Sequence, residues 1–394
     1  MRKNKKLKSI VYVNYSPYEN SGKILDFLVE NFEKVFLFSL GFHQLGKKKQ
    51  YNRLLIYING KLHEQKSLIQ IPVQQKLIFL LLPLRSLITF VQILTYSFWL
   101  KNKYGKINFY FTVNAFTAWI GAIAKRIGIV NKTIFWVWDY YPSFHENKVI
   151  RFMRYIYWQF DKISSNSDHV IYVNQRLIDL RKDMGVLPKD ARFPIIPIGT
   201  DSFDIKLKVK KDVVLGFIGV LKKSHGLDVI FNNADEIVKD FPKARFEVIG
   251  SGPDEEYFRR RAKNSSISTK FYGYLKGETF NDVLRRCSIG IALYIPDKSN
   301  VSHYGDPGKI KRYLSLGIPV ILTNVLEFSK EVENARAGVI VDYNNSSAFI
   351  NAVKRIMSSY LEYSENALKL SSKFYYKDIY PSMFEFDRNK PSKT

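Results

Sequence analysis

Residues 303–324 read HYGDPGKIKRYLSLGIPVILTN, and the rest of the chain is interpreted outward from this stretch. The Pro-Gly pair at 307–308 predicts a helix start. Proline lacks the N–H that would be unpaired there, and glycine lets a ligand approach the backbone. Gly317 and Pro319 predict that the helix ends before the apolar run Val320–Leu322, which has the character of a buried strand. The expected order is therefore loop, helix, turn and strand.

The start of this helix is a predicted anion site. Free N–H groups and the positive end of the helix dipole attract negative charge there, and Lys309 in the first turn adds a full positive charge. We therefore expect Asp306, Pro307, Gly308 and Lys309 to cradle a diphosphate. The alternative is an ordinary surface helix of an α/β domain, which the local pattern alone does not exclude.

The same stretch resembles the donor-site signature of family 4 of the GT-B glycosyltransferases, the glycosyl transferases group 1. The matching positions are Pro307, Lys309, Tyr313, Gly317, Pro319 and Val320. The family often carries two glutamates eight residues apart, and Tyr304 and Arg312 stand at those positions in this chain. The resemblance implies two Rossmann-like domains that face a cleft. It also implies a bound nucleotide-diphospho-sugar, with Tyr304 and Arg312 among its contacts.

The length and the strand pattern predict two domains. A chain of 394 residues with 46% apolar residues can fill two cores. Strand-like and helix-like segments alternate, which is typical of doubly wound parallel sheets. The polar segment 202–212 predicts a linker. We expect an acceptor-side Rossmann-like domain at 1–205 and a nucleotide-sugar-binding one at 206–370. The remainder, 371–394, is expected to cross back onto the first domain, as the terminal helix does in GT-B folds.

Two features of the first domain fit the resemblance. Residues 197–201, Pro-Ile-Gly-Thr-Asp, match the P-x-G-x-D motif that stands at the end of the N-terminal domain in family 4. The strand expected at 132–138 is followed by Asp139. Ligands bind at the carboxyl ends of parallel strands in open α/β sheets, so Asp139 is a candidate catalytic residue, together with Lys309. The alternative is that Asp139 only caps the following turn.

The loop after the strand expected at 213–218 is the second part of the predicted donor site. Gly219 lets the backbone approach a ligand. Lys222 and Lys223 would neutralise a diphosphate from the side opposite Lys309. Lysines that are merely solvated in a loop are the alternative interpretation.

The resemblance adds two expectations about this domain. The loop is similar to the family's G-x-L...K-G loop, with His225 in place of the lysine of Lys-Gly. Tyr274, at the end of the strand expected at 269–274, would line the base pocket. The sequence Gly-Ser-Gly-Pro at 250–253 lacks the third glycine of a nucleotide fingerprint, and we interpret it as a turn.

The net charge of +25 indicates anionic partners. Of 61 basic and 36 acidic residues, 30 and 14 lie in residues 1–205, so the excess is mostly N-terminal. Such a charge attracts nucleic acid, anionic phospholipid or a diphosphate-bearing substrate. The sequence has no helix-turn-helix, zinc-knuckle or RRM-type motif, so we expect no nucleic-acid partner. The single Cys287 excludes an intramolecular disulfide and suits a reducing cytoplasm.

Residues 77–100, LIFLLLPLRSLITFVQILTYSFWL, are the one candidate for membrane contact. Their length would allow a span, but Pro83 and Arg85 interrupt the apolar run. The favoured interpretation is a helix that partly covers the core and partly meets lipid, while a wholly buried helix and a transmembrane span stay open. The basic N-terminus is followed by an apolar run of only strand length, so we do not expect a signal peptide. These patterns predict a cytoplasmic protein attached peripherally to an anionic surface, the inner face of the cell membrane.

These observations predict a hexosyltransferase-type glycosyltransferase. It would transfer a sugar from a nucleotide-diphospho-sugar to a glycan or polyprenyl-diphosphate-linked acceptor in cell-surface polysaccharide synthesis. Neither a metal nor a cofactor is expected, because the helix start and the lysines supply positive charge and the sequence has no Asp-x-Asp motif. The resemblance implies retention at the anomeric carbon, whereas a general-base role of Asp139 would allow inversion. Tyr304 and Arg312 suggest the alternative, a catalytically inactive GT-B subunit that binds a glycan or a partner enzyme.

Overall fold

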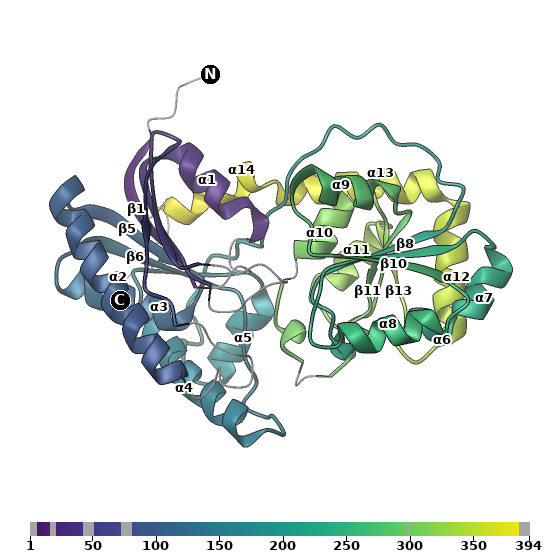
Figure 1. Ribbon diagram of the computed structural model, residues 1–394, viewed down its shortest axis with the longest axis horizontal. Helices are drawn as coiled ribbons and strands as arrows, with labels where there is room; N and C mark the ends of the chain where they lie inside the picture. Colours follow the sequence, from purple (N-terminus) through teal and green to yellow (C-terminus); the bar gives the residue numbers. More distant parts are fainter. Residues whose placement is uncertain are drawn as a thin grey trace. The chain divides into compact units, whose positions relative to one another are not determined.

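The structure is a computed structural model that describes residues 6–15, 21–41, 51–71, 81–297, 300–306 and 308–385. The chain divides into two compact units. The first comprises residues 1–197 together with 379–394, and the second comprises residues 198–378. Each unit is an α/β structure built around its own sheet (Figure 1). The boundary expected at residue 205 therefore falls inside the second unit.

The described residues of the first unit contain a seven-stranded sheet with the order β4-β3-β2-β1-β5-β6-β7. Its strands are β1 Leu7–Asn14, β2 Phe32–Ser39, β3 Arg53–Ile58, β4 Lys61–Ser67, β5 Ile107–Thr112, β6 Val130–Val137 and β7 His169–Tyr172. β2, β1, β5, β6 and β7 pair in parallel, whereas β3 pairs antiparallel with both β2 and β4 at one edge. The sequence pattern did not predict β4, because KLHEQKS has almost no apolar residues. Charged residues suit an exposed edge strand, which must not pair with other chains.

Helices cover both faces of this sheet (Figure 1). They are α1 Ile24–Asn31, α2 Leu82–Tyr104, α3 Ala115–Arg126, α4 Lys148–Ser164 and α5 Gln175–Asp183. Successive residues of β1 point to opposite faces. Val11 and Val13 share a core with Ile93 of α2 and Ile120 of α3. Tyr12 instead packs with aromatic rings on the other face.

The C-terminal residues complete this second face. The 3-10 helix Tyr380–Phe384 (η6) places the ring of Phe384 5.2 Å from that of Phe32, and the ring of Tyr380 5.6 Å from that of Phe27. The Tyr380 hydroxyl also donates a hydrogen bond of 2.6 Å to the carbonyl of Gly22. Residues 379–385 thus belong structurally to the first unit, although they follow the second unit in the chain.

The described part of residues 77–100 forms most of α2, and residues 77–80 lie outside the described residues. One side of α2 covers the core of the first unit, and residues Leu84, Leu87, Val91 and Phe98 on its other side are exposed. Among the described residues, none of the helices has both the length and the apolar content needed to cross a membrane.

The second unit has a six-stranded, fully parallel sheet with the order β10-β9-β8-β11-β12-β13 in its described residues. The strands are β8 Val214–Ile218, β9 Arg245–Ile249, β10 Ser268–Gly273, β11 Ile289–Ala292, β12 Val320–Leu322 and β13 Gly338–Ile340. One core cluster joins the sheet to α6 Asp228–Asn232, α7 Ala234–Asp240, α8 Glu255–Lys263 and α12 Ser346–Ser358. A second cluster joins the sheet to α9 Gly277–Arg286, α10 Gly308–Ser315, α11 Ser329–Asn334 and α13 Tyr360–Ser371. The sheet is therefore doubly wound.

Residues 202–212, expected to be a linker, lie along the second unit. The ring of Phe203 and the side chain of Ile205 pack against its core. Just ahead of them, the Thr200 N–H donates to the carbonyl of Phe374 at 2.8 Å, and the Tyr376 N–H donates to the carbonyl of Thr200 at 3.1 Å. The many charged residues of this segment predicted a free linker. The apolar residues Phe203 and Ile205 between them nevertheless face the core.

Candidate functional site

The helix predicted from residues 303–324 is α10, and Tyr313 fixes its position. The Tyr313 hydroxyl donates to the carbonyl of Gly216 at 2.9 Å and accepts the N–H of Ile218 at 2.8 Å, so α10 is tied to the backbone of β8. A Cβ at Gly290 of β11 would lie 2.5 Å from the Tyr313 ring, which shows how closely the helix packs on the sheet. Gly308 is the first residue of α10, and Pro307 lies outside the described residues.

Lys309, in the first turn of α10, has its ammonium sealed inside the second unit. Its side chain is half-buried overall, but Nζ is shielded from solvent and has no hydrogen-bond partner in the part of the chain that the structure describes. Nζ lies 4.5 Å from the ring centroids of both Phe217 and Tyr294. The ring faces favour a cation, but burial without a counter-ion lowers the pKa of Lys309 to about 7. A ligand with negative charge would supply the missing partner.

The loop after β8 approaches this ammonium, as the sequence predicted. A Cβ at Gly219 would lie 3.7 Å from Lys309 Nζ, and Gly219 has a φ of 137°, which side chains rarely adopt. A second loop holds the first in place: the Gly219 N–H donates to the carbonyl of Ile249 at 2.9 Å, and the Leu221 N–H donates to that of Ser251 at 3.1 Å. A Cβ at Gly250 would lie 1.9 Å from the Gly219 carbonyl oxygen. The Gly-Ser-Gly turn is thus the support of the predicted site.

His225 completes the surroundings of Lys309. Its ring lies 5.3 Å from that of Tyr294 and 6.1 Å from that of Phe217, and Nδ1 is 2.7 Å from the carbonyl oxygen of Val220. A carbonyl oxygen only accepts, so Nδ1 carries a proton that it donates. Burial, and then the charge of Lys309, lower the pKa of His225 to about 3, so the imidazole is neutral. The family's lysine is therefore replaced by a residue without charge.

The two loop lysines are arranged differently from each other. Both are exposed, and the charge of Lys222 reaches the site, since it contributes to the lowered pKa of His225. The ammonium of Lys223 instead lies 4.3 Å from the centroid of the Tyr257 ring, and the backbone N–H of Lys223 donates to the Asp254 carboxylate at 2.8 Å. Lys222 is therefore better placed than Lys223 to add positive charge beside Lys309.

Asp306 holds the loop ahead of α10. Its carboxylate is buried, accepts the N–H of Ile198 at 2.7 Å, and forms an ion pair with the buried ammonium of Lys311. The Lys311 ammonium also lies 4.8 Å from the centroid of the Phe374 ring. This buried pair positions the loop that leads to Gly308, and the carboxylate is engaged by the protein. Lys311 carried no sequence signal, because a lysine at helical spacing looks solvent-exposed.

Arg312 is also held by protein groups. One guanidinium nitrogen donates to Asp201 at 2.7 Å and another to Asn281, while the group lies 4.6 Å from the centroid of the Phe203 ring. The last residue of the P-x-G-x-D motif, Asp201, thus neutralises the arginine that replaces a family glutamate. This ion pair between Arg312 and Asp201 holds the segment before residue 212 against the second unit.

The two remaining predicted contacts lie at other places. The ring of Tyr304 lies 4.9 Å from that of His303, in the turn before α10. Tyr274 follows β10, the edge strand, and is 47% exposed, with the Lys276 ammonium 5.3 Å from its ring centroid. β10 lies two strands away from β8, about 10 Å at the usual spacing of neighbouring strands. Tyr274 is therefore not a direct neighbour of the Gly219 loop.

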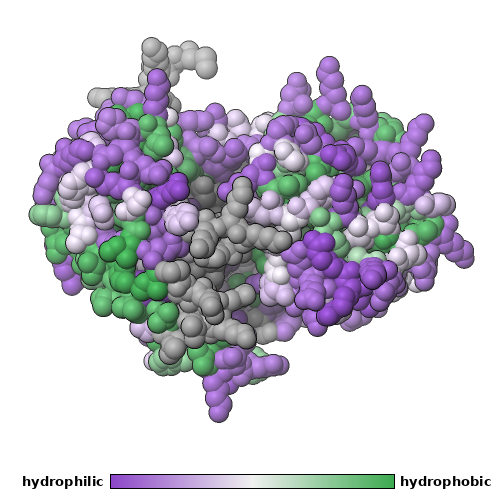
Figure 2. Space-filling view, viewed as in Figure 1, coloured by the Kyte–Doolittle hydropathy of each residue, from purple (hydrophilic) through white to green (hydrophobic). Residues whose placement is uncertain are grey.

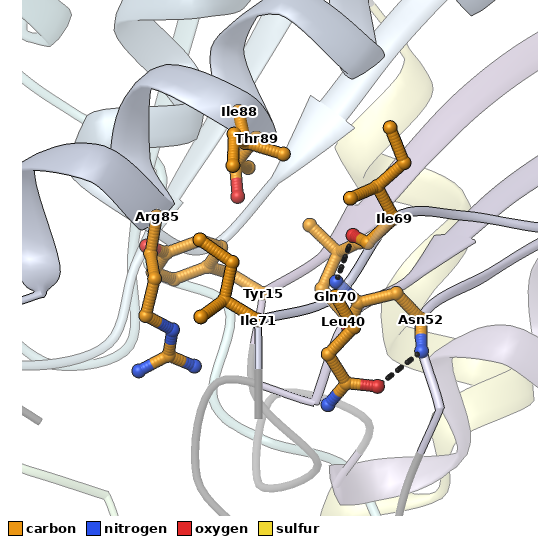
Figure 3. A pocket seen from close by; sticks show the side chains of 9 residues that line it. All are labelled: Tyr15, Leu40, Asn52, Ile69, Gln70, Ile71, Arg85, Ile88 and Thr89. Atoms are coloured by element: carbon orange, nitrogen blue, oxygen red, sulfur yellow. Dashed lines mark hydrogen bonds between the residues drawn. The ribbon is translucent and has the colours of Figure 1, made fainter. Parts of the chain in front are cut away.

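In the first unit, Asp139 follows β6 at the carboxyl end of the strand, where it was expected, and is half-buried. The same edge of the sheet holds a recess beside β1 and β2 (Figure 3). It is lined by Tyr15, Leu40, Asn52, Ile69, Gln70, Ile71, Arg85, Ile88 and Thr89. The side chain of Arg85, from the first turn of α2, extends beside Tyr15 and Ile71, and burial lowers the pKa of its guanidinium. The recess combines apolar walls with one cation.

The geometry of the second unit agrees with comparison to known proteins. Residues 212–359 match the sequence profile of the family Glycosyl transferases group 1. This part of the chain is a group 1 glycosyltransferase domain. The matched range includes the Gly219 loop, Lys309 and the Gly-Ser-Gly turn that holds this loop. The groups described around the buried ammonium therefore lie within the glycosyltransferase domain. No curated protein matches the sequence.

Solved structures show that the whole chain has the fold expected with such a domain. Sucrose-phosphate synthase from Thermosynechococcus elongatus has a TM-score of 0.69 and 14% identity, over 96% of this chain and 97% of that one. Anabaena HepE in complex with UDP-glucose has a TM-score of 0.65 and 14% identity, over 96% and 98%. The lipopolysaccharide outer core galactosyltransferase WaaB has a TM-score of 0.58 and 13% identity, over 96% and 99%.

At these identities the likeness shows the fold, which is GT-B with two Rossmann-like units. The prediction of this fold is confirmed, and the prediction of a group 1 glycosyltransferase is confirmed for the domain at residues 212–359. Enzymes of this group are metal-independent and retain the anomeric configuration.

Proposed function

We propose that this glycosyltransferase takes its sugar from a nucleotide-diphospho-sugar and that Lys309 holds the diphosphate. The observation that supports this most directly is the buried Lys309 ammonium, which has no hydrogen-bond partner among the described residues and lies beside Gly219 in the first turn of α10. Glycine leaves the backbone accessible to a phosphate, and the helix start adds N–H groups that favour an anion. The UDP-glucose bound to Anabaena HepE, a protein of the same fold, supports this class of donor.

Charge development on the leaving group explains why a buried cation would serve here. When the sugar–phosphate bond breaks, the nucleoside diphosphate gains negative charge, and a fixed cation in a water-poor site stabilises that charge more than one in water does. Lys309 would fill this role, with Lys222 as the second cation, because His225 is neutral. The remaining predicted donor contacts, Tyr304 and Tyr274, stay proposals.

For the acceptor we propose a glycan or polyprenyl-diphosphate-linked glycan of cell-surface polysaccharide synthesis, bound by the first unit. The recess beside β1 and β2 supports this, because its apolar walls and the Arg85 guanidinium suit a molecule with both an apolar part and an anionic group. Asp139 at the carboxyl end of β6 is the proposed group toward the acceptor hydroxyl.

We further propose that the enzyme works in the cytoplasm, attached peripherally to the inner face of the cell membrane. The support is the N-terminal excess of basic residues together with the exposed apolar side of α2. Anionic lipids attract such a surface. A protein that stays unbound to anionic vesicles even at low salt would contradict this part of the proposal.

The Lys309→Ala variant tests the donor site. Isothermal titration with UDP, and then with UDP-, GDP- and TDP-sugars, gives donor affinity. A hydrogen bond to a charged group contributes about 1.5 to 3 kcal/mol, so affinity should fall about tenfold to over a hundredfold. Lys309→Arg should restore it only partly, because a planar guanidinium does not occupy the same point. The control is Lys239→Ala, which removes an exposed lysine of α7 and should bind like the wild type.

The outcomes separate the possible functions. Unchanged UDP affinity in Lys309→Ala would remove the site assignment. Donor binding without turnover, across a panel of acceptors, would favour the inactive binding subunit suggested by Tyr304 and Arg312. Asp139→Asn is nearly isosteric and should keep donor binding while lowering turnover about 100- to 10,000-fold if the carboxylate acts as a base. Wild-type turnover in the folded Asp139→Asn protein would leave Asp139 as a turn residue.

A further inference from the structure

Helix α2 buries several polar residues beside its apolar core contacts and exposes large apolar ones. Its buried side includes the polar residues Thr89, Gln92 and Ser97. Gln92 accepts the N–H of Ile69 at 2.6 Å and donates to the carbonyl of the same residue at 3.1 Å, so its amide completes the backbone bonding of the segment after β4. The exposed side carries large apolar residues at helical spacing, and these are Leu84, Leu87, Val91 and Phe98. A surface helix in water normally shows the opposite pattern.

Helix α4 exposes a similar stripe. Val149, Phe152, Tyr155 and Ile163 lie on its outer side. The exposed fractions of these four residues and of the four on α2 range from 47% to 61%. The loop before α4 adds Phe144, which is 68% exposed, and Arg154 of α4 holds this loop by donating to the carbonyl of Phe144 at 2.9 Å. Apolar patches of this extent are rare on soluble monomers and mark interaction surfaces.

A band of aromatic rings joins the two helices across α3. The Trp119 ring of α3 lies 5.3 Å from Phe90 of α2 and 5.2 Å from Phe160 of α4. All three rings are only partly buried, so the apolar surface continues from α2 across α3 to α4. Figure 2 shows hydrophobic residues gathered over α2. We call the surface formed by α2, α3 and α4 the three-helix face.

The charge of the three-helix face selects its partner. The three helices, which the structure describes in full, carry nine basic residues, of which Lys103 and Lys125 form ion pairs with Glu64 and Asp168 outside these helices. Their one acidic residue, Asp161, is 2% exposed and bound by Arg181 at 2.7 Å, so no carboxylate of these helices offers a charge to a partner. Lys148, Arg151 and Lys162 are exposed next to the apolar stripe of α4. Apolar and aromatic residues flanked by lysine and arginine suit the interface of an anionic bilayer.

We propose that the three-helix face is the surface by which this protein lies on an anionic membrane, with the apolar residues of α2 and α4 inserted among the lipids. This inference rests on the membrane attachment proposed above and names the surface responsible. A second copy of the chain fits less well, because two faces with the same positive charge repel each other. The position of α2 also places the recess, which contains Arg85 of its first turn, next to the membrane surface, where a lipid-linked acceptor lies.

The test compares matched variants of the full chain in flotation assays with vesicles. The vesicles contain phosphatidylcholine alone or mixed with phosphatidylglycerol. The apolar variant is Leu87→Gln, Val91→Gln, Phe152→Gln, and the charge variant is Lys148→Gln, Arg151→Gln, Lys162→Gln. The control is Leu62→Gln, Val209→Gln, Leu361→Gln, which removes three exposed hydrophobic residues outside the three-helix face.

The wild type and the control should bind the anionic vesicles, and only part of this binding should be lost at high salt. The charge variant should bind about a hundredfold more weakly, since each basic residue near an anionic surface changes affinity about fivefold. The apolar variant should bind at least about tenfold more weakly at every salt concentration. UDP affinity should be equal in all four proteins, which separates loss of membrane binding from loss of the donor site.

Three results would overturn the inference. If the wild type does not bind anionic vesicles, both the attachment and its surface are wrong, while UDP binding still tests the donor site separately. If both variants bind vesicles like the control, attachment stands and the three-helix face is not its surface. If sedimentation shows a wild-type dimer that the apolar variant abolishes, and vesicle binding is unchanged, the face is an interface between copies of the chain.

Discussion

The two units treat buried charge alike and exposed surface differently. The first buries Asp161 with Arg181, and the second buries Asp306 with Lys311; in both pairs the cation also lies near aromatic rings. The second unit seals a further ammonium, Lys309, inside the protein. The first unit instead exposes large hydrophobic side chains on α2 and α4. The second unit thus has a buried cation that suits a small anion. The first unit has an exposed apolar surface that suits an extended partner.

Breaking the buried ion pairs should have the largest effect, and it should separate the units. Arg181→Met and Lys311→Met each leave a buried carboxylate without its cation, which costs about 3 to 5 kcal/mol of unfolding free energy. Denaturant unfolding measures both. Only Lys311→Met should also weaken UDP binding, because only that pair holds the loop before α10. Adding Asp306→Leu to Lys311→Met should recover part of the lost stability. Wild-type stability in either single variant would contradict the role given to that pair.

Two glycines with nearly the same backbone conformation provide the next comparison. Gly128 in the first unit has a φ of 73° and nothing within 4 Å of an added Cβ, whereas Gly226 has a φ of 68° and an added Cβ would lie 1.7 Å from the carbonyl oxygen of Leu293. Gly128→Ala should cost about 1 to 2 kcal/mol, from backbone strain alone. Gly226→Ala adds a clash and should cost about 2 to 5 kcal/mol. Equal losses in thermal unfolding would show that the loop relaxes freely around position 226.

The pH dependence of Lys309 gives a smaller, graded effect. Burial lowers its pKa to about 7 from 10.5. Between these values the unfolded chain binds the additional proton, so raising the pH through this window should stabilise the second unit, by at most about 1.4 kcal/mol per pH unit. UDP requires the ammonium, so its affinity should fall above pH 7, by up to about tenfold per pH unit.

Calorimetry of UDP binding at a series of pH values above 7 measures this dependence. The diphosphate of UDP is almost fully ionised there. In Lys309→Arg both dependences should disappear, since the guanidinium stays charged. A wild-type affinity that does not change with pH, alongside a weak Lys309→Ala variant, would mean that Lys309 remains charged without its ligand.

Substitution of single exposed hydrophobic residues should have the smallest effect on stability. Tyr155→Gln on α4 and Leu361→Gln on α13 should each change the free energy of unfolding by no more than about 0.5 kcal/mol, because neither side chain is buried. Flotation with anionic vesicles at high salt distinguishes the two variants, because only Tyr155→Gln should reduce the binding that remains there. A large loss of stability in Tyr155→Gln would mean that the stripe on α4 contributes to the fold of the free protein.

Most of the fold could be predicted from the sequence because periodicity reports burial. The strands expected at 213–218 and 132–138 are runs of mostly apolar residues between turns, and the bounds of β8 and β6 agree with them within about two residues. β4 could not be found, because an exposed edge strand needs no apolar residues. The segment 202–212 was misread for a related reason. Its apolar residues alternate with charged ones, and only the folded unit shows that Phe203 and Ile205 pack against the core.

The positions of site residues could be predicted where they depend on the end of a helix or strand. Lys309 and Gly219 lie close together as expected, because each follows from a strand or helix end. Side-chain pairing was not predictable: Arg312 is neutralised by Asp201, which is distant in sequence. The neutral state of His225 depends on burial that the sequence does not show. The apolar side of α4 was also missed, because a sequence does not reveal which side of a helix faces the protein.

The extended segment that begins at Ile198 has a practical consequence for dividing this protein. A fragment cut at Val213, where the strand pattern begins, would lose Asp201 and Thr200, and with them the partners of Arg312 and of the chain around Phe374. A fragment that starts ahead of Ile198 and ends after Asp378 keeps these bonds within one polypeptide. The second unit should therefore be obtainable as an independent recombinant domain, and chimaeras that exchange the first unit should be joined before Ile198 and again after Asp378.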